Sequence, residues 1–546
     1  MARYKQPSVI VAAVVAVVAW FLIRNQQAQE RWQQESDAAN LVPGTNNTVL
    51  FFITGVHGLT NVHYATIQGL LEHHPHVEIH LAVPVDKESK SSSIYSGQAA
   101  KLARIAAFAQ ARSPAARDPA FHPLPGPSWV DALQANSDVT VAGMIQPPGY
   151  AGVARFSKQI QHSLAPWTNE EYLHIYQSAR DLIEQVDPAI VVLDTMFMPA
   201  VDSARESRRL YAFITPNTLV DNFVAEQPWL GMLWKYPIMG TDFAFPVPWR
   251  DIPENALAAA KLIWSVLNVP VVKAKQRFLR EQGIRDPINF YKMHRPHVPW
   301  LTQTMEGASI PVEVIPSNVT CTGPIVLSAA PAAVQDPELA AWLARGQGKT
   351  LLINLGSSIE KYTPEQASTM AAAIRATLEK QYGIQVLWKV VNAAEREAEL
   401  EQLSDLVANG RVKIAGWFKV DPVSLLETGD IMASVHHGGS NCYHEAIYTG
   451  VPQVVLPMWA DLYNYAALVE NIGVGVYGSR GTAPSWTVEG LTDAFLAVVD
   501  GEKAVGMREK AQNLSLKAKA RPGRVVAAAE IAKWAGSGRV SDGSKK

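Results

Sequence analysis

The sequence predicts an α/β protein in which parallel strands alternate with helices in a doubly wound arrangement. Short apolar runs that suit buried strands alternate with longer segments that suit helices. The stretch His437–Asp461 also has the order glycine turn, helix and strand, which is typical of a ligand-binding loop at the end of a parallel strand. With 546 residues, the chain is long enough for two or three domains with large cores.

Charge and cysteine content exclude several functional classes. Lys and Arg number 48 against 50 Asp and Glu, so the net charge of −2 gives no reason to expect a nucleic-acid partner. Cys321 and Cys442 are the only cysteines, which argues against a disulfide framework or a cysteine-based metal site. No Gly-x-x-x-x-Gly-Lys-Ser/Thr phosphate loop occurs in the sequence.

The first part of the chain contains a long apolar run, Val9–Ile23, between basic flanks. The run is short for a membrane span, long for a signal-peptide core, and has no clean cleavage site before Arg24. We expect residues 1–40 to form an uncleaved signal anchor with its juxtamembrane segment. A cleaved signal peptide is the second alternative. A buried soluble helix is disfavoured because the polar stretch Asn25–Gln34 follows directly.

Arg3, Lys5 and the terminal amine favour a cytosolic N-terminus for this single-pass membrane anchor. That orientation would place the domains that follow the anchor in the endoplasmic reticulum and the secretory pathway. Sequons at Asn46, Asn318 and Asn513 permit a glycoprotein there.

Elements of the first half follow the anchor and the linker Leu41–Asn47. The expected strands are Thr48–Thr54, Val77–Val83, Pro188–Asp194 and Tyr211–Thr215, with a loop over Gly55–Thr60 and a helix over Val62–His73. The prolines of Ser113–Ser128 predict an irregular excursion. The aromatic and proline-rich segment Trp229–Trp249 either shapes a ligand pocket or forms an ordinary capping subdomain.

The second half begins with a linker and first elements over Cys321–Gln347. The expected parallel strands are Thr350–Asn354, Gln385–Val391, Val412–Ala415, Ile431–Val435 and Val454–Leu456, with a helix near Pro364–Gln381. A further helix, Ser440–Thr449, should end at Gly450, because Pro452 forbids its continuation. The tail Gly536–Lys546 is polar and expected to be disordered.

The glycine turn before Ser440 predicts an anion site. Free backbone N–H groups and the positive end of the helix dipole both favour a phosphate there. Asn441 and Cys442 lie on the first turn, and Glu445 shares a helix face with Asn441. A carboxylate at Glu445 repels phosphate but suits the vicinal diol of a ribose. With Asp461 after the next strand, the pattern indicates a nucleotide sugar.

These residues resemble the donor signature of UDP-dependent glycosyltransferases, most closely the fungal and bacterial branches. The matching motifs are His437–Asn441, Glu445-Ala446, Gly450–Pro452 and Pro457–Asp461. Further similarities are Gly323-Pro324, Trp342-Leu343, Leu352–Ser357, Val191–Asp194 and Arg521–Arg524. Because the signature is long and ordered, it is far more specific than a lone His-Gly-Gly.

The resemblance implies a GT-B fold, in which two facing Rossmann-like domains enclose a cleft. We expect an acceptor-binding domain over residues 45–325, a UDP-sugar-binding domain over 326–515, and a C-terminal helix and tail over 516–546.

The same resemblance assigns the donor contacts. Trp417 is the expected uracil platform, Glu445 the ribose ligand and Asp461 a sugar contact. The residues expected around the diphosphate are His437, Gly439, Ser440, Asn441, Cys442 and Ser357. No metal is required, because the helix N-terminus and His437 would stabilise the departing diphosphate.

The expected reaction is attack of an acceptor hydroxyl on the anomeric carbon, which displaces UDP and needs a base. Members of the family usually carry Gly-His after the first strand, whereas this chain carries Gly58-Leu59. We expect His57 to be the base, oriented by Asp194. His63 is the alternative base, although it also suits the helix surface or a pocket wall.

Two further departures from the family concern the donor. Val420 stands near the usual uracil-reading Gln, and Leu462 stands where a Gln often reads sugar hydroxyls. These departures leave the sugar unspecified. Glucose is the default because it is the commonest sugar of the family, so the expected donor is UDP-glucose. The anchor and the aromatic acceptor half favour a hydrophobic small-molecule or lipid acceptor.

Two alternatives from other classes remain. Leu59 raises the possibility of a non-catalytic relative that binds nucleotide sugar or lipid as a sensor or partner. A nucleotide-sugar epimerase is disfavoured, because no Gly-x-Gly-x-x-Gly follows the first strand and no suitable Tyr-x-x-x-Lys pair occurs.

Overall fold

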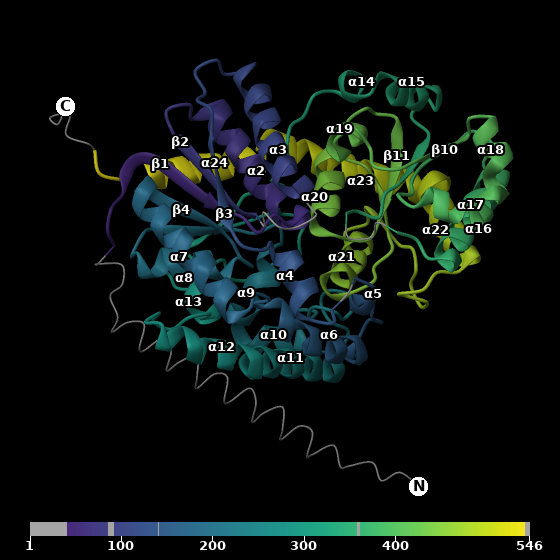
Figure 1. Cartoon of the computed structure of the whole chain (residues 1–546). Helices are drawn as coiled ribbons and strands as arrows, with labels where there is room; N and C mark the ends of the chain where they lie inside the picture. The colour runs from purple at the N-terminus through teal and green to yellow at the C-terminus, as the bar shows by residue number, and fades with distance from the viewer. Residues whose placement is uncertain (1–40, 86–91, 140, 358–360, 541–546) are drawn as a thin grey trace, which may run out of the picture.

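The computed structural model describes residues 41–85, 92–139, 141–357 and 361–540. It contains two parallel β-sheets, each covered by helices, which occupy the two sides of Figure 1. Alternating βα units confirm the doubly wound α/β prediction.

The first sheet has the strand order β3-β2-β1-β4-β5-β6-β7, with all neighbours parallel. Its strands are β1 (Thr45–Phe52), β2 (Glu78–Val85), β3 (Ala120–Pro125), β4 (Pro188–Asp194), β5 (Tyr211–Ile214), β6 (Trp300–Thr302) and β7 (Val319–Cys321). The central strands are buried on both faces, which explains their unbroken apolar sequences.

Helices of the first half, of which the later ones form the lowest layer in Figure 1, pack on both faces of this sheet. They are α2 (His57–His73), α3 (Ser92–Gln110), α4 (Trp129–Asn136), α5 (Val141–Met144), α6 (Tyr150–Ser163), α7 (Asn169–Val186), α8 (Met198–Glu206), α9 (Leu219–Phe223), α10 (Gly231–Trp234), α11 (Ile252–Leu267), α12 (Pro270–Glu281) and α13 (Phe290–Met293). Short 3₁₀ turns, Val224–Glu226 and Pro228–Leu230, connect α9 to α10.

Two local predictions in this half were wrong. The predicted irregular excursion contains strand β3, whose prolines Pro123 and Pro125 are tolerated because β3 is the edge strand of the sheet. The predicted loop Gly55–Thr60 is also shorter than expected, since α2 already begins at His57. His57 is therefore the first residue of a helix rather than part of a free loop.

The second sheet has the order β10-β9-β8-β11-β12-β13, again parallel throughout. Its strands are β8 (Thr350–Ile353), β9 (Gln385–Lys389), β10 (Val412–Ala415), β11 (Ile431–His436), β12 (Gln453–Val455) and β13 (Gly475–Tyr477). Its helices are α14 (Ala332–Gln335), α15 (Pro337–Arg345), α16 (Pro364–Lys380), α17 (Glu397–Leu400), α18 (Ser404–Ala408), α19 (Pro422–Leu426), α20 (Ser440–Thr449), α21 (Ala460–Asn471) and α22 (Val488–Val499), with 3₁₀ turns at Ala393–Arg396 and Glu401–Leu403.

The C-terminal helices α23 (Gly501–Ala520) and α24 (Gly523–Ala535) lead back to the first half of the molecule. Figure 1 shows the yellow α24 among the purple N-terminal elements, where it packs against α2. The approach is close, because a Cβ atom on Gly69 would lie 2.5 Å from the carbonyl oxygen of Arg524. Buried Ala528 and Ile531 of α24 thus complete the core beneath α2.

Within the described ranges, one helical stretch, Ile252–Glu281, meets the length and composition expected of a membrane span. It is interrupted in the structure, since α11 ends at Leu267 and α12 begins at Pro270. The predicted anchor Val9–Ile23 lies outside the described residues and stays a prediction.

Candidate active site

The carboxyl ends of three strands in the second sheet form the floor of the candidate site. Gly356 and Ser357 follow β8, Lys389 ends β9, and the turn His437–Gly439 separates β11 from α20. These strands are neighbours in the order β9-β8-β11, so their ends lie side by side. This is the edge at which open α/β sheets bind ligands.

The glycine turn has the conformation that the sequence predicted. Gly438 has φ +97°, a region that residues with a side chain rarely adopt. Its N–H group donates to Nδ1 of His436 at 3.1 Å, and Nε2 of that ring lies 2.8 Å from Oε1 of Gln453. Buried His436 therefore supports the turn from below.

The ring of His437 is held between two glycines. A Cβ atom on Gly356 or Gly439 would lie 2.4 Å or 2.6 Å from its Cε1 atom. Desolvation, with the nearby charges of His436 and Lys389, lowers the pKa of His437 to about 3, so the ring is neutral. Its buried Nδ1 atom has no hydrogen-bond partner among the described residues. A polar atom of this kind at a strand edge is suited to a ligand contact.

Helix α20 presents its backbone, rather than its side chains, to the space above the turn. Its N-cap Gly439 has no side chain that could satisfy the first N–H groups. The Ser440 hydroxyl donates to the carbonyl of Pro216, and the Asn441 amide donates to the carbonyl of Gly58 at 2.9 Å. Both side chains thus connect the second half of the chain to the first.

Cys442 and Glu445 lie further along the same helix. Desolvation raises the pKa of the Cys442 thiol to about 12, so the sulfur remains protonated. Desolvation also raises the pKa of Glu445 to about 7, while Lys101 opposes this shift and Asp421 reinforces it. Glu445 is half-buried and titrates close to neutral pH.

Trp417 and Lys389 form a pair that the sequence reading did not anticipate. Trp417, the predicted uracil platform, has 56 % of its surface exposed in the loop after β10. The Lys389 ammonium lies 4.2 Å from the centre of the indole ring. A basic residue at the carboxyl end of an otherwise apolar strand was the one available signal for Lys389.

His57, the predicted base, lies across the cleft in the first half. Its side chain is exposed, and desolvation in the cleft, together with the charges of Lys101 and Lys389, lowers its pKa to about 4. Both lysines are therefore close enough to disfavour an imidazolium. Lys101 is itself fixed by a bond from its Nζ atom to Oδ1 of Asn61 at 2.6 Å.

Asp194, at the end of β4, is buried and directed toward the loop that precedes α2. Its Oδ2 atom accepts from the Thr54 hydroxyl at 2.7 Å, and its Oδ1 atom accepts from the N–H of Met196 at 3.0 Å. Desolvation raises the pKa of Asp194, whereas these hydrogen bonds lower it. The structure thus connects Asp194 to the loop before His57, and direct orientation of His57 stays a prediction.

His63 occupies the interior face of α2. Its side chain is fully buried, its ring lies edge-on to Phe51, and desolvation lowers its pKa to about 3. Neither ring nitrogen has a hydrogen-bond partner among the described residues. This packing differs from the helix-surface position considered for His63.

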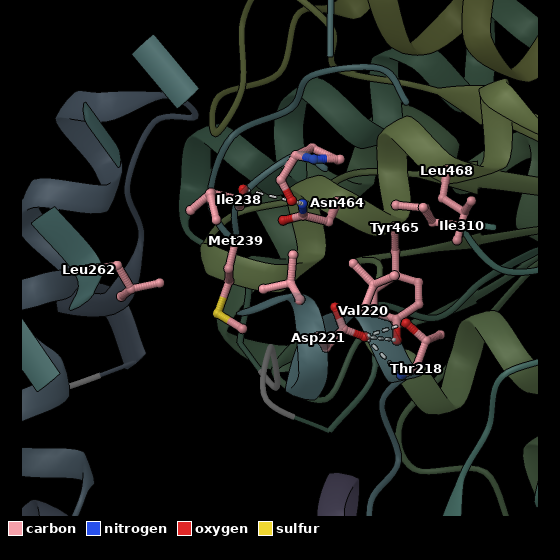
Figure 2. A pocket seen from close by; sticks show the side chains of 12 residues that line it. Thr218, Val220, Asp221, Ile238, Met239, Leu262, Ile310, Asn464, Tyr465 and Leu468 are labelled. Atoms are coloured by element: carbon pink, nitrogen blue, oxygen red, sulfur yellow. Dashed lines mark hydrogen bonds between the residues drawn. The ribbon is translucent and has the colours of Figure 1, made fainter. Parts of the chain in front are cut away.

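An apolar pocket lies between the two halves beside α21 (Figure 2). Its apolar wall includes Ile238, Met239 and Ile310, so part of the aromatic segment Trp229–Trp249 lines a pocket. Figure 2 shows Leu262 of α11 across the opening from Asn464, Tyr465 and Leu468 of α21.

The carboxyl group of Asp221 lies on the polar side of this pocket. Asp221 accepts from the N–H and hydroxyl groups of Thr218, both at 2.8 Å, and from the Tyr465 hydroxyl at 3.3 Å. Asp461 begins α21 nearby, and desolvation followed by the charge of Asp221 raises its pKa to about 7. Asp221 is a second residue that the sequence reading missed, because it follows no motif.

Comparison with known proteins gives consistent results. Residues 389–533 match the family model described as erythromycin biosynthesis protein CIII-like, C-terminal domain. The chain is 33 % identical over 465 residues to glycosyltransferase sdnJ of Sordaria araneosa, covering 84 % of this chain and 88 % of the relative. It is 24 % identical over 257 residues to mouse 2-hydroxyacylsphingosine 1-beta-galactosyltransferase, covering 47 % and 43 % of the two chains.

Solved structures share the architecture. A UDP-glucosyltransferase from Polygonum tinctorium, in complex with 3,4-dichloroaniline, aligns with a TM-score of 0.59 at 19 % identity. The alignment covers 91 % of this chain and all of the other. At this level of identity the likeness establishes the fold, which is the predicted GT-B arrangement.

Proposed function

The chain belongs to the UDP-glycosyltransferase family, and we propose that it moves a sugar from a UDP-sugar to a hydroxyl group of a hydrophobic small molecule or lipid. Its glycosyltransferase activity follows from the family. The donor, the acceptor class and the roles of single residues are the proposal.

One observation carries the proposed donor. The neutral ring of His437, the uncapped start of α20 and the exposed Trp417 lie around one edge of the second sheet, with Glu445 one helical turn further. Backbone N–H groups and a neutral imidazole suit a diphosphate, an exposed indole suits a base, and a carboxylate suits a ribose diol. A ligand with these parts in this order is a nucleoside diphosphate, which is the portion that all nucleoside diphosphate sugars share.

The proposed chemistry is a single displacement with inversion. The acceptor oxygen forms a bond to the anomeric carbon as the bond to the diphosphate oxygen breaks, and the departing electron pair stays on UDP. The acceptor proton passes to His57, whose low pKa keeps its ring unprotonated at neutral pH. Asp194 fixes Thr54 and thereby the loop that precedes His57.

The apolar pocket supports a hydrophobic acceptor. Val220, Ile238 and Met239 supply apolar surface, and Asp221 with Tyr465 supplies a polar side. Some relatives point in the same direction, since one is named for a sphingosine substrate and a structural neighbour holds a dichloroaniline. Because Leu462 cannot hydrogen-bond to a sugar, glucose remains the default donor sugar on family frequency alone.

The test is UDP release by the purified full-length chain in detergent. UDP-glucose, UDP-galactose, UDP-N-acetylglucosamine and UDP-glucuronate would each be combined with a panel of hydroxylated lipids and aglycones. We expect acceptor-dependent release with one donor. UDP binding without release from any pair would favour the non-catalytic alternative, and absence of UDP binding would refute the proposed donor site.

We also propose that Val9–Ile23 anchors the protein in the endoplasmic reticulum membrane, on the basis of its apolar sequence and basic flanks. Alkaline extraction of membranes from expressing cells tests this. The full-length chain should stay in the membrane pellet, whereas recovery in the supernatant would contradict the anchor.

A further inference from the structure

We propose that Lys389 is the residue that neutralises the departing diphosphate, by contacting it through the side-chain ammonium group. This inference rests on the proposed function, because it assumes that the second half binds a UDP-sugar. It adds a residue to the donor site that neither the sequence signature nor the comparisons assign.

The strand register places Lys389 at the level of the phosphate-binding turn. Trp388 of β9 is opposite Ile353 of β8, which is opposite Val435 of β11. The next residue along each strand brings Lys389 level with His436, directly before His437. Lys389 therefore lies at the same edge of the sheet as the turn, and only strand β8 separates its strand from β11.

The side chain of Lys389 is directed into this edge rather than toward bulk water. Only 4 % of its surface is exposed, although lysine is rarely buried. Its Nζ atom donates to the carbonyl oxygen of Gly356 at 2.6 Å, which places the ammonium beside the glycine that contacts His437. The Trp417 ring, 4.2 Å away, borders the other side.

The positive charge of Lys389 lowers the pKa of groups on three separate elements. It disfavours protonation of His57 on α2 and of His437 in the turn, and it favours the thiolate of Cys442 on α20. All three residues belong to the proposed active site. A cation that acts on all of them is close to that site.

A full positive charge is needed here because the helix N-terminus supplies only about half an elementary charge. When the anomeric carbon–oxygen bond breaks, its electron pair moves onto the terminal phosphate oxygen of UDP, so the negative charge increases during the reaction. An ammonium group fixed in a water-poor site stabilises this developing charge more than it stabilises the intact donor. Lys389 transfers no proton in the proposed step, and the acceptor proton goes to the base.

The experiment compares UDP with uridine, which lacks the diphosphate. Calorimetric titration of the full-length chain gives both affinities, and steady-state kinetics give kcat and KM. Lys389→Met keeps the length of the side chain and removes its charge. We expect UDP affinity to fall by about 10-fold and kcat by about 100-fold, with uridine affinity unchanged.

Two further variants separate charge from structure. Lys389→Arg retains the charge and should keep the preference for UDP over uridine within about threefold of the unaltered chain. Lys413→Met makes the same substitution on the neighbouring strand β10 and should leave both affinities unchanged. If Lys389→Met does not fold, Lys389→Arg and Lys389→Gln give the same comparison.

The possible failures can be distinguished. Equal losses of UDP and uridine affinity in Lys389→Met would show a structural role and overturn this inference. Unchanged UDP affinity and kcat would also overturn it, while leaving the proposed function intact. If the unaltered chain bound neither UDP nor uridine, the proposed donor site would fail and this inference with it.

Discussion

In the proposed reaction His57 is the base, and Asp194 supports the segment that precedes it instead of pairing with it directly. Asp194 bonds to Thr54, and three residues later His57 begins α2. Desolvation, reinforced by the charges of Lys101 and Lys389, lowers the pKa of His57 to about 4 and so favours the neutral imidazole. A neutral imidazole can accept the acceptor proton, whereas a protonated one cannot.

Replacing His57 tests this role. His57→Ala should reduce kcat by about 10²–10⁴-fold, because the acceptor hydroxyl loses its base, and should leave UDP affinity unchanged. His73→Ala, on the same helix with an exposed side chain, is the matched control and should retain full activity. Normal turnover by His57→Ala would exclude His57 as the base.

If Glu445 belongs to the donor site as proposed, it should make UDP binding depend on pH. Its raised pKa of about 7 means that the folded, unliganded protein holds the proton more tightly than an unfolded chain does. Its contribution to stability is therefore largest at low pH and is lost as the pH rises from about 4.5 to 7. Binding of a ribose diol instead requires the deprotonated form of Glu445, because only the carboxylate accepts hydrogen bonds from both hydroxyl groups.

UDP affinity should accordingly decrease as the pH falls from 8 to 6, as Glu445 becomes protonated. Calorimetric titration across this range measures the effect. Glu445→Gln should bind UDP more weakly at pH 8 and should show a flatter profile. If the UDP affinity of Glu445→Gln depended on pH in the same way as that of the unaltered chain, the titrating group would be a residue other than Glu445.

Helix α20 shows which part of an element can be predicted from sequence. Its start at Ser440 and its end at Gly450 followed from the glycines and from Pro452. The cross-cleft bonds of Ser440 and Asn441 did not, because they depend on residues more than two hundred positions away. Lys389 was missed for the same reason: its position beside Trp417 depends on the packing of neighbouring strands.

The turn before α20 also explains why two glycines are needed around one histidine. Gly439→Ala would place Cβ 2.6 Å from the His437 ring, and the ring would have to move away from the donor edge. We expect UDP affinity to fall at least about 10-fold, the cost of roughly one lost charge-assisted contact. Gly506→Ala in α23, where an added Cβ meets no atom within 4 Å, is the control for binding. Unchanged affinity in Gly439→Ala would mean that His437 does not contact the donor.

The two halves of the molecule are joined by polar contacts as well as by the chain. The Tyr443 hydroxyl donates to the carbonyl of Ala308, and the N–H of Gly240 donates to Oδ1 of Asn464 at 3.1 Å. Arg104 and Asp421 form an exposed ion pair across the same cleft at 3.5 Å. Parallel strands could be anticipated from the βα alternation, but the strand order and these contacts could not.

The return of α24 to the first half predicts a long-range effect on stability. Gly69→Leu should force α2 and α24 apart, because the obstacle at 2.5 Å is backbone rather than a flexible side chain. We expect a loss of about 1–3 kcal/mol in the free energy of unfolding, measured by denaturant titration. Gly97→Leu on α3, where the added side chain meets open space, should change little. Equal free energies of unfolding for Gly69→Leu and the unaltered chain would show that α2 and α24 can separate at no cost.

The position of α24 also has a consequence for biosynthesis. Arg539 pairs with Thr45, and α24 covers α2, so the first domain to leave the ribosome is completed by the last helix to be made. Until then, the apolar face of α2 that packs against Ala528 and Ile531 has no cover. The nascent first half therefore completes its core only after the second half has been synthesised, and this face stays open to other apolar surfaces until then.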